Sequence, residues 1–497
     1  MSSHVGEAIG HSAGTIAELA ADLATRLPPG HLLTDPTALR AYDCDGLTSY
    51  RVTPALVVLA GDEHEVAVTV EACSRHGVPF VSRGSGTGLS GGATPSADGV
   101  LIVLSRLRSI QRIDVDDHRA VVDPGVINLD VTRAASPHGL YYAPDPSSQQ
   151  VCSIGGNVAE NSGGAHCLKY GFTSNHVTGL DVVIASGEKV SLGGYALEYP
   201  GYDLVGAFVG SEGTLGVVTS ATVRLLRAPE KVRTLLAGFP STDAAGAAVS
   251  SIIARGIVPA AIEMMDELAI EAAERAVACG YPRTAAVLIV ELDGSATAVD
   301  HDMALVQEIV DAEGAVALRH ADDPIDRAAI WRGRKSAFAA VGRISPDYYV
   351  QDGVVPRTAL PEVLRRIGEL AQEAGLRVAN VFHAGDGNLH PLVLYDASVP
   401  GESERGAELS SDIVELCVSL GGSITGEHGV GLDKVCSMPK MFSETDLEVM
   451  QLLRDVFDVD RLCNQGKLYP TPGLCGEKPG PRSGVHPLVA EGLAEMF

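Results

Sequence analysis

Apolar and polar positions alternate along the chain in a way that separates strand-like from helix-like segments. Residues 55–60 (ALVVLA) and residues 78–82 (VPFVS) are continuous apolar runs, as in buried strands. Residues 61–77 between them have helical spacing, with Asp62 placed to cap the helix and Gly77 to end it. The pattern therefore predicts a β-α-β unit.

Strand signals then follow one another without long helices until Leu226, in the runs GVLIVLS, RAVVDPGV, HVTGLDVVIASGEKV and LGVVTSATVRLL. The segment RAPEKVR breaks this pattern. After it, helical stretches such as residues 241–256 alternate with strands such as residues 285–292. Residues 442–460 are predicted to form a helix with Ser443 as its N-cap and an acidic first turn. The chain is thus predicted to be α+β.

Length and charge restrict the function. The 497 residues exceed one ordinary core, so we expect two or more domains. The net charge of −26 would repel nucleic acid and an acidic membrane surface, and it leaves an anionic substrate in need of a local cation. No apolar run approaches the ~20 residues of a membrane helix. Residues 1–27 have the pattern of an amphipathic helix rather than a signal peptide, so we expect a cytoplasmic protein.

The nine cysteines are scattered and include no C-x-x-C pair. This spacing argues against a disulfide framework, a zinc ribbon or a cysteine-bound iron–sulfur cluster. We expect the cysteines to be reduced and packed as small apolar side chains.

The first glycine-rich stretch, residues 82–93 (SRGSGTGLSGGA), contains G-x-G-x-x-G. A dinucleotide fold would need a helix directly after it and an acidic residue about 20 positions on. A strand follows instead, and no carboxylate lies near position 106. The Rossmann fold is therefore excluded. Bare backbone N–H groups still suit a pyrophosphate, with a flexible surface loop as the alternative. Residues 141–171 and 210–219 form two further blocks, which look like walls against a flat polar ligand.

The segment NVFHAGDGNLHPLVL places His383 and His390 on either side of a glycine-rich turn. Asp386-Gly387 is a favoured two-residue hairpin turn, and this register would make the two histidines direct cross-strand neighbours, with Cβ atoms ~4.5–5.5 Å apart. A longer turn would weaken that argument, and two packed histidines are the alternative. Glu427, in GEHGVG, would complete a set of two histidines and one carboxylate. Such a set suits zinc, manganese or iron(II).

The order of these blocks resembles flavoenzymes of the vanillyl-alcohol-oxidase (p-cresol methylhydroxylase, PCMH) type. The matching blocks cover roughly residues 35–470 and are PFVSRGSGTGLSGGA, APDPSS…SIGGNVAENSGG…KYG, FVGSEGTLGVVT, WRGRKSAF, NVFHAGDGNLHP, GGSITGEHGVG and NQGK. Within this family the chain is most similar to FAD-linked D-2-hydroxy-acid dehydrogenases, and nearest to the D subunits of bacterial glycolate dehydrogenases (glycolate oxidases).

The resemblance implies a two-part FAD-binding domain of the vanillyl-alcohol-oxidase/PCMH type plus an α+β substrate (cap) domain. The expected divisions are an N-terminal helical segment (1–45), the PCMH-type domain (46–228), a substrate- and metal-binding cap domain of the FAD-linked oxidase C-terminal type (229–450), a C-terminal helix returning to the flavin domain (451–470) and a surface tail (471–497).

By the same resemblance, FAD lies against the three glycine-rich blocks. The implied contacts are Ser82, Arg83, Gly84, Ser85, Gly86, Thr87, Gly88, Pro144, Asp145, Ser147, Ser148, Gly155, Gly156, Asn157, Asn161, Gly164, Glu212, Gly213, Gly216, Val217, Val218 and Asn464. Some relatives attach the flavin through a histidine in the first loop. That loop has no histidine here, so FAD is expected to be noncovalent.

The resemblance assigns one divalent metal (zinc, manganese or iron) to His383, His390 and Glu427. It assigns the clamping of the substrate carboxylate to Arg334. His428 is the candidate base that takes the hydroxyl proton while a hydride moves to flavin N5, with a histidine that only packs beside the metal as the alternative. The neighbouring charges of Arg332 and Lys335 are expected to be solvated.

Relatives that act on D-2-hydroxyglutarate carry a threonine, a lysine and an asparagine where this chain has Phe338, Val350 and Leu392. A second carboxylate would lose its partners here, so we expect a short substrate, glycolate or alternatively D-lactate. The chain has no iron–sulfur motif to pass electrons on. The resemblance implies a second flavin-type subunit and an iron–sulfur subunit, which could bring the chain to the membrane.

Overall fold

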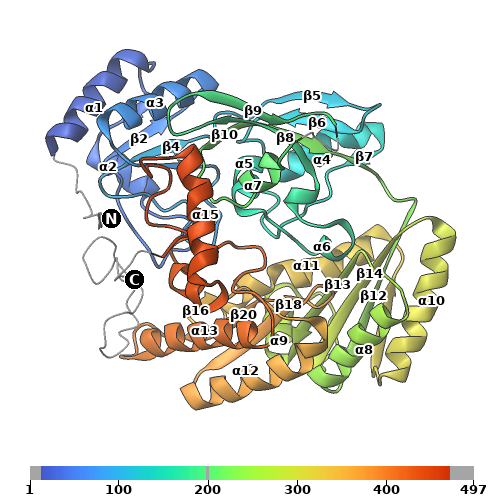
Figure 1. Ribbon diagram of the computed structural model, residues 1–497. Coiled ribbons are helices and arrows are strands. Elements are labelled where there is room, and N and C mark those ends of the chain that lie inside the picture. Colours follow the sequence, from blue (N-terminus) through green and yellow to red (C-terminus); the bar gives the residue numbers. More distant parts are fainter. Residues whose placement is uncertain (1–12, 197–200, 471–497) are drawn as a thin grey trace.

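The computed structural model of the chain describes residues 13–196 and 201–470 (Figure 1). Its first half begins with a four-stranded sheet ordered β1-β2-β4-β3, in which the last three strands run parallel. These strands are β1 (Leu32–Leu33), β2 (Leu56–Leu59), β3 (Phe80–Arg83) and β4 (Val100–Val103). Helices α1 (Ala13–Arg26), α2 (Pro36–Leu39) and α3 (Glu63–His76) accompany this sheet. The apolar faces of α1 and α3 pack with β2, β3 and β4 in one core cluster.

The predicted β-α-β unit is confirmed. The Asp62 carboxylate accepts the Glu65 N–H at 2.9 Å and begins α3, and Gly77 ends it in the left-handed region at φ 64°. The glycine-rich loop after β3 leads into strand β4 rather than into a helix. This agrees with the prediction that the loop is not part of a Rossmann fold.

An antiparallel five-stranded sheet ordered β5-β6-β10-β8-β9 completes the first half. Its strands are β5 (Ile110–Asp114), β6 (Arg119–Val122), β8 (Val177–Val183), β9 (Lys189–Gly193) and β10 (Val217–Arg224). The connections carry α4 (Asn128–Ala135), α5 (Ile154–Glu160), α6 (Cys167–Tyr170) and α7 (Leu204–Phe208), and a two-stranded ladder joins β7 (Leu140–Tyr141) to β11 (Leu226–Arg227).

The second half is built on a larger, mostly antiparallel sheet, with the path β15-β12-β14-β13-β18-β19-β17. Its strands are β12 (Lys231–Phe239), β13 (Ala261–Asp266), β14 (Ala286–Gly294), β15 (Ala317–Ala321), β17 (Gly353–Val354), β18 (Arg377–His383) and β19 (Asn388–Leu389), while β20 (Pro391–Tyr395) joins β18 to β16 (Asp347–Val350).

Helices cover both faces of this sheet, which explains its continuous apolar runs. Helices α8 (Thr242–Ala254), α10 (Ala296–Ala312), α12 (Leu360–Ala374) and α13 (Glu402–Ser419) contribute to one core cluster, and α9 (Glu267–Val277) and α11 (Pro324–Val341) to the other. Alternate residues of β14 enter the two clusters, Leu288 the first and Ile289 the second. The predicted α+β class is confirmed.

The C-terminal part of the chain returns to the first half. Helix α14 (Met438–Met441) precedes α15 (Glu444–Phe457), whose predicted Ser443 cap is confirmed by a capping box with Asp446. The chain then runs beside β3, where Phe80 N–H donates to the Leu462 carbonyl at 2.9 Å. Figure 1 shows α15 lying between the two halves. Short 3-10 helices occur at Arg40–Tyr42, Ser136–His138, Thr173–Asn175, Arg357–Ala359 and Val435–Ser437.

Seven cysteines of the described residues are free, and six of these are buried, as expected for reduced cysteines packed as small apolar side chains. The predicted tail, 471–497, lies outside the described residues. None of the helices within residues 13–196 and 201–470 has the length and apolarity needed to cross a membrane.

Candidate functional site

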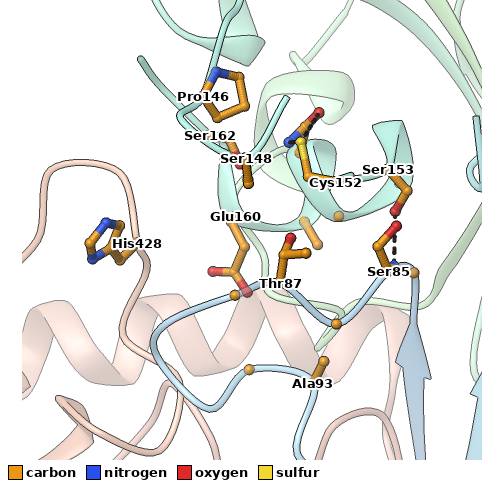
Figure 2. Close-up of a pocket in the computed structure, with 18 of the residues that line it drawn as sticks. Ser85, Thr87, Ala93, Pro146, Ser148, Cys152, Ser153, Glu160, Ser162 and His428 are labelled. Atoms are coloured by element: carbon orange, nitrogen blue, oxygen red, sulfur yellow. Dashed lines mark hydrogen bonds between the residues drawn. The ribbon is translucent and has the colours of Figure 1, made fainter. Parts of the chain in front are cut away.

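A cavity of about 410 Å³ lies among the glycine-rich loops, and residues of the second half, among them His428, line one side of it (Figure 2). Its walls come from the loop after β3, the segment around α5, the loop before β10, helix α11 and the loop 426–431. The predicted cofactor contacts that line it are Ser82, Gly84, Ser85, Gly86, Thr87, Gly88, Ser147, Ser148, Gly155, Gly156, Asn157, Glu212, Gly213, Gly216 and Val218.

The other predicted contacts lie behind these walls. Arg83 donates to the Cys44 carbonyl at 2.5 Å, and the Asn464 amide donates to the Gly92 carbonyl at 3.0 Å. Asp145 binds His166, and the Pro144 carbonyl accepts from Asn128. The remaining three predicted contacts are explained by backbone conformation or by core packing. Asn161 ends α5 at φ 48°, Gly164 has φ 155°, and Val217 packs in the core.

The glycines of the cavity wall have two different reasons to lack a side chain. A Cβ at Gly86 would lie 2.4 Å from Arg83 Nη2, and one at Gly155 would lie 2.6 Å from the Pro124 ring. A Cβ at Gly88 or Gly156 would meet protein only at 4.0 or 3.5 Å, so it would take up cavity space. The open space beside Gly88 and Gly156 fits a wall that a ligand approaches closely. The volume of the cavity falls within the range of small-molecule sites.

Several wall residues were not named individually among the predicted cofactor contacts. They are Pro146, Cys152, Ser153, Glu160, Ser162 and Gly163, and Phe338, predicted to limit the substrate, also lines the cavity. Ser153 Oγ accepts the Ser85 N–H at 3.3 Å and so ties two of the glycine-rich loops together (Figure 2). Most of these residues belong to the glycine-rich block 141–171, which was the sequence feature that indicated a wall here. The spacing of residues in that block does not reveal which side chains face the cavity.

Glu160 is a buried acid of this wall, and it points into the cavity as His428 does (Figure 2). Its Oε2 is buried without a hydrogen-bond partner. Burial, together with the nearby carboxylates of Glu212 and Asp45, raises the pKa of Glu160 well above its ordinary value. A wall carboxyl of this kind can hold a proton and donate it to a polar ligand.

The predicted two-residue turn between the histidines is wrong. His383 pairs with Asn388, so four residues, 384–387, form the turn, and the Gly387 N–H donates to the His383 carbonyl at 3.1 Å. His390 is two residues beyond Asn388 and faces the same side of the ladder. The two imidazoles remain close, with ring centroids 5.1 Å apart and planes at 89°. They meet as diagonal rather than direct cross-strand neighbours.

His383, His390 and Glu427 converge. Glu427 Oε1 lies 3.3 Å from His383 Nε2 and 3.0 Å from His390 Nε2, and the donor atoms of all three lie within 4.8 Å of one another. His390 Nε2 is buried and lacks hydrogen-bond alignment with that oxygen. Three donor atoms that crowd together, one of them without a hydrogen-bond partner, fit a shared cation, and two imidazoles with one carboxylate are a common divalent set.

Carboxylates set the charge of this cluster. Burial opposes ionisation of Glu427, but the charges of His383 and His390 and the hydrogen bond with His383 outweigh it and lower the pKa of Glu427 well below its usual value. His383 Nδ1 bonds Glu263 Oε1 at 2.7 Å. A carboxylate on the far nitrogen of a histidine fixes its ring for a metal on the near nitrogen. Glu263 was not predicted from the sequence.

His428 lines the cavity next to this cluster. Its ring stacks on His390, with centroids 5.0 Å apart and planes at 14°. Burial lowers the pKa of His428 to about 4. The loop that carries it is joined to the first half, because the Glu212 carboxylate accepts the Val430 and Gly431 N–H groups at 2.6 and 2.7 Å.

Arg334 is buried on α11, where Nε donates to Glu263 Oε2 at 2.7 Å. The guanidinium carbon lies 5.7 Å from the ring centroid of Phe338, one helical turn on, and Phe338 lines the cavity. Arg334 itself is outside the wall. Lys335, expected to be a solvated charge, is exposed but also borders the cavity.

Comparisons with known proteins agree with this arrangement. Residues 54–193 match a family described as FAD binding domain, and residues 228–468 match one described as FAD linked oxidases, C-terminal domain. The glycolate oxidase subunit GlcD of Escherichia coli K12 is 50% identical, over 92% of this chain and 91% of that protein. D-lactate dehydrogenase of Anaerostipes hadrus is 30% identical, over 89% and 95%.

The structure of p-cresol methylhydroxylase with substrate bound has a TM-score of 0.75, at 14% identity, and the match covers 92% of this chain and 97% of that one. The predicted vanillyl-alcohol-oxidase/PCMH fold type is confirmed.

Proposed function

This chain belongs to the family of FAD-linked oxidases, and from that premise we propose that it oxidises a short D-2-hydroxy acid, foremost glycolate, to the 2-keto acid. It is an FAD-dependent oxidoreductase. One observation carries the choice of substrate class: Glu427 of the histidine–carboxylate cluster and the adjacent His428 line the same cavity as the glycine-rich loops. A hydroxy acid held by the cluster would lie against the ring system held by the loops.

Bound FAD supplies a hydride acceptor, and a divalent ion on His383, His390 and Glu427 supplies a Lewis acid that lowers the pKa of a hydroxyl group. His428 is proposed as the base that takes the hydroxyl proton. Its place in the cavity wall, one residue from Glu427, supports this role. FAD is proposed to be noncovalent, because the first glycine-rich loop carries no histidine.

Arg334 is proposed to bind the substrate carboxylate. Glu263 takes its Nε–H, which leaves terminal N–H groups of the guanidinium for a second carboxylate. Its packing against Phe338, which lines the cavity, supports this role. The pair with Glu263 would hold the guanidinium in one orientation as the substrate arrives.

The walls favour a small substrate. Of the three positions, Phe338 lines the cavity, with its ring 5.8 Å from that of His390, whereas Val350 and Leu392 belong to a core cluster behind it and are not part of the wall. A distal carboxylate that reached Phe338 would meet an apolar ring, at ~1–3 kcal/mol for the missing partner. The similarity to a glycolate oxidase subunit supports glycolate. D-lactate is the second candidate, supported by the similarity to a D-lactate dehydrogenase.

Partner proteins are proposed from the same similarity, because the E. coli relative is named a subunit. Reduced flavin must pass its electrons on. We propose a second flavin-type subunit and an iron–sulfur subunit, which would bring this chain to the membrane.

Anaerobic flavin reduction tests the proposal. Glycolate and D-lactate should bleach the flavin absorbance, and D-2-hydroxyglutarate should do so at least ~5-fold more slowly, from the cost of one unpaired group. Metal analysis of the same sample should find one divalent ion per chain. Chelation should stop reduction while FAD stays bound, and added metal should restore it. A flavin that stays oxidised with all three acids would refute the assignment.

A further inference from the structure

We propose that Asp352 is a positioning residue of the metal site, where it fixes the backbone that carries Glu427 and orients the ring of His390. The inference rests on the proposed metal site and extends it to a residue that makes no direct contact with the ion. Asp352 lies between β16 and β17 and is fully buried.

One oxygen of Asp352 holds the segment that carries the carboxylate ligand. Oδ2 accepts hydrogen bonds from Thr425 Oγ1 at 2.5 Å and from the N–H groups of Gly426, Glu427 and His428 at 2.9, 3.1 and 2.9 Å. Three successive N–H groups aimed at one anion form a backbone nest. This contact fixes the course of the chain at Glu427 and His428, so it fixes where both side chains begin.

A buried cation sustains the charge of Asp352. Lys434 Nζ lies 3.6 Å from Oδ2 and donates to the Asp352 backbone carbonyl at 2.7 Å. Removing the negative charge would leave this buried ammonium without its counter-ion and would weaken the acceptor of the three N–H groups. The carboxylate is therefore matched to its surroundings as an anion rather than as a neutral group.

The other oxygen faces the histidine ligand. Oδ1 and His390 Nδ1 are both buried without a hydrogen-bond partner, and they lie 3.9 Å apart. A rotation of the ring or one bridging water would join them. Nδ1–H would then donate toward Asp352, which leaves the lone pair of Nε2 for a metal. Glu263 has the same relation to His383, so each imidazole has a carboxylate behind it.

Asp352→Asn tests this role, with Asp458→Asn as the matched control. Asp458 is also a fully buried carboxylate that accepts two backbone N–H groups, from Leu462 and Cys463 at 2.9 and 2.8 Å, and lies 3.5 Å from the Arg454 guanidinium. It faces no histidine of the cluster. Both variants are purified as FAD-loaded protein and titrated with Mn²⁺, with free Mn²⁺ followed by electron paramagnetic resonance. Bound FAD and the melting temperature are recorded for each variant.

Wild type should bind one Mn²⁺, and D352N should bind it about 10- to 100-fold more weakly while keeping its FAD. D458N should match wild type in Mn²⁺ affinity whatever its melting temperature. Equal affinity of D352N and wild type would overturn the inference alone. Two ions on wild type with one lost in D352N would also overturn it, because Asp352, His390 and His428 would then be ligands of a second ion. A wild type that binds no divalent ion would overturn the metal site itself.

Discussion

At the scale of single residues, groups behind the donor atoms complete the candidate site. Glu263 bonds both His383 and Arg334, so one carboxylate joins a proposed metal ligand to the proposed substrate clamp. Glu160 adds a buried carboxyl to the cavity wall. Glu263 lies in none of the quoted motifs, and Glu160 lies inside the block SIGGNVAENSGG without having been singled out. Motif spacing therefore predicted the donors but not the groups that orient them.

Replacing His428 by Ala separates proton transfer from binding. We expect FAD and metal content to stay at the wild-type level, because His428 is not a proposed ligand, and the rate of flavin reduction by glycolate to fall by about 10²–10⁴-fold. Anaerobic stopped-flow absorbance measures the rate. The exposed His64 on α3 provides the control, since H64A should reduce like wild type. Reduction at the wild-type rate in H428A would remove His428 as the base.

At the scale of elements, helices with local caps were predictable and the histidine hairpin was only partly so. Helix α3 and helix α15 begin at Asp62 and Ser443 because each cap bonds a nearby N–H group. The turn at 384–387 depends on a distant contact, since the Val355 N–H donates to the Gly387 carbonyl at 3.0 Å. The sequence predicted two adjacent antiparallel strands. Their register depends on the neighbouring strands, because β13 pairs with β18 and β17 pairs with β19.

Gly387 tests whether this turn sets the metal site. It has φ 83°, and a Cβ there would lie 2.1 Å from the Val355 carbonyl oxygen. G387A should lower the free energy of unfolding by the ~1–2 kcal/mol cost of the left-handed backbone plus ~1–3 kcal/mol for the clash, and should weaken metal binding. Chemical denaturation and Mn²⁺ titration measure the two effects.

Gly375 is the matched control, because its φ is 66° and a Cβ there meets nothing within 4 Å. G375A should show only the backbone cost and wild-type metal affinity. Equal losses in both variants would mean that backbone conformation, not the close approach to Val355, accounts for the effect.

At the scale of the whole molecule, a partly buried ion network joins the two halves. His166, from the first half, bonds Asp145 at 2.8 Å and Glu291 of β14 at 3.2 Å, and its ring stacks on Trp331 of α11. Burial opposes protonation of His166. The charges and hydrogen bonds of Asp145 and Glu291 outweigh burial and raise the pKa of His166 well above its ordinary 6.5.

This raised pKa gives the stability of the molecule a pH dependence. Because protonated His166 is favoured in the folded state, its contribution is fully present below pH 6.5 and is lost as the pH rises through the folded-state pKa. The difference in unfolding free energy between wild type and His166→Gln should therefore be larger at about pH 6 than at about pH 9. Urea denaturation at both pH values measures it. A difference that is constant with pH would exclude a charged His166.

The sequence by itself determined the class of the fold, the glycine-rich loops and the residue types of the cluster. Those features depend on local periodicity, on caps and on bare backbone, which neighbouring residues specify. Only the tertiary structure decided the four-residue turn, the pairing of Arg334 with Glu263 and the placing of Asp352 against residues 425–428. Each depends on a contact between segments tens of residues apart, which for the turn is that of Val355 with Gly387, and a contact of that range depends on how sheets and helices pack rather than on any spacing along the chain.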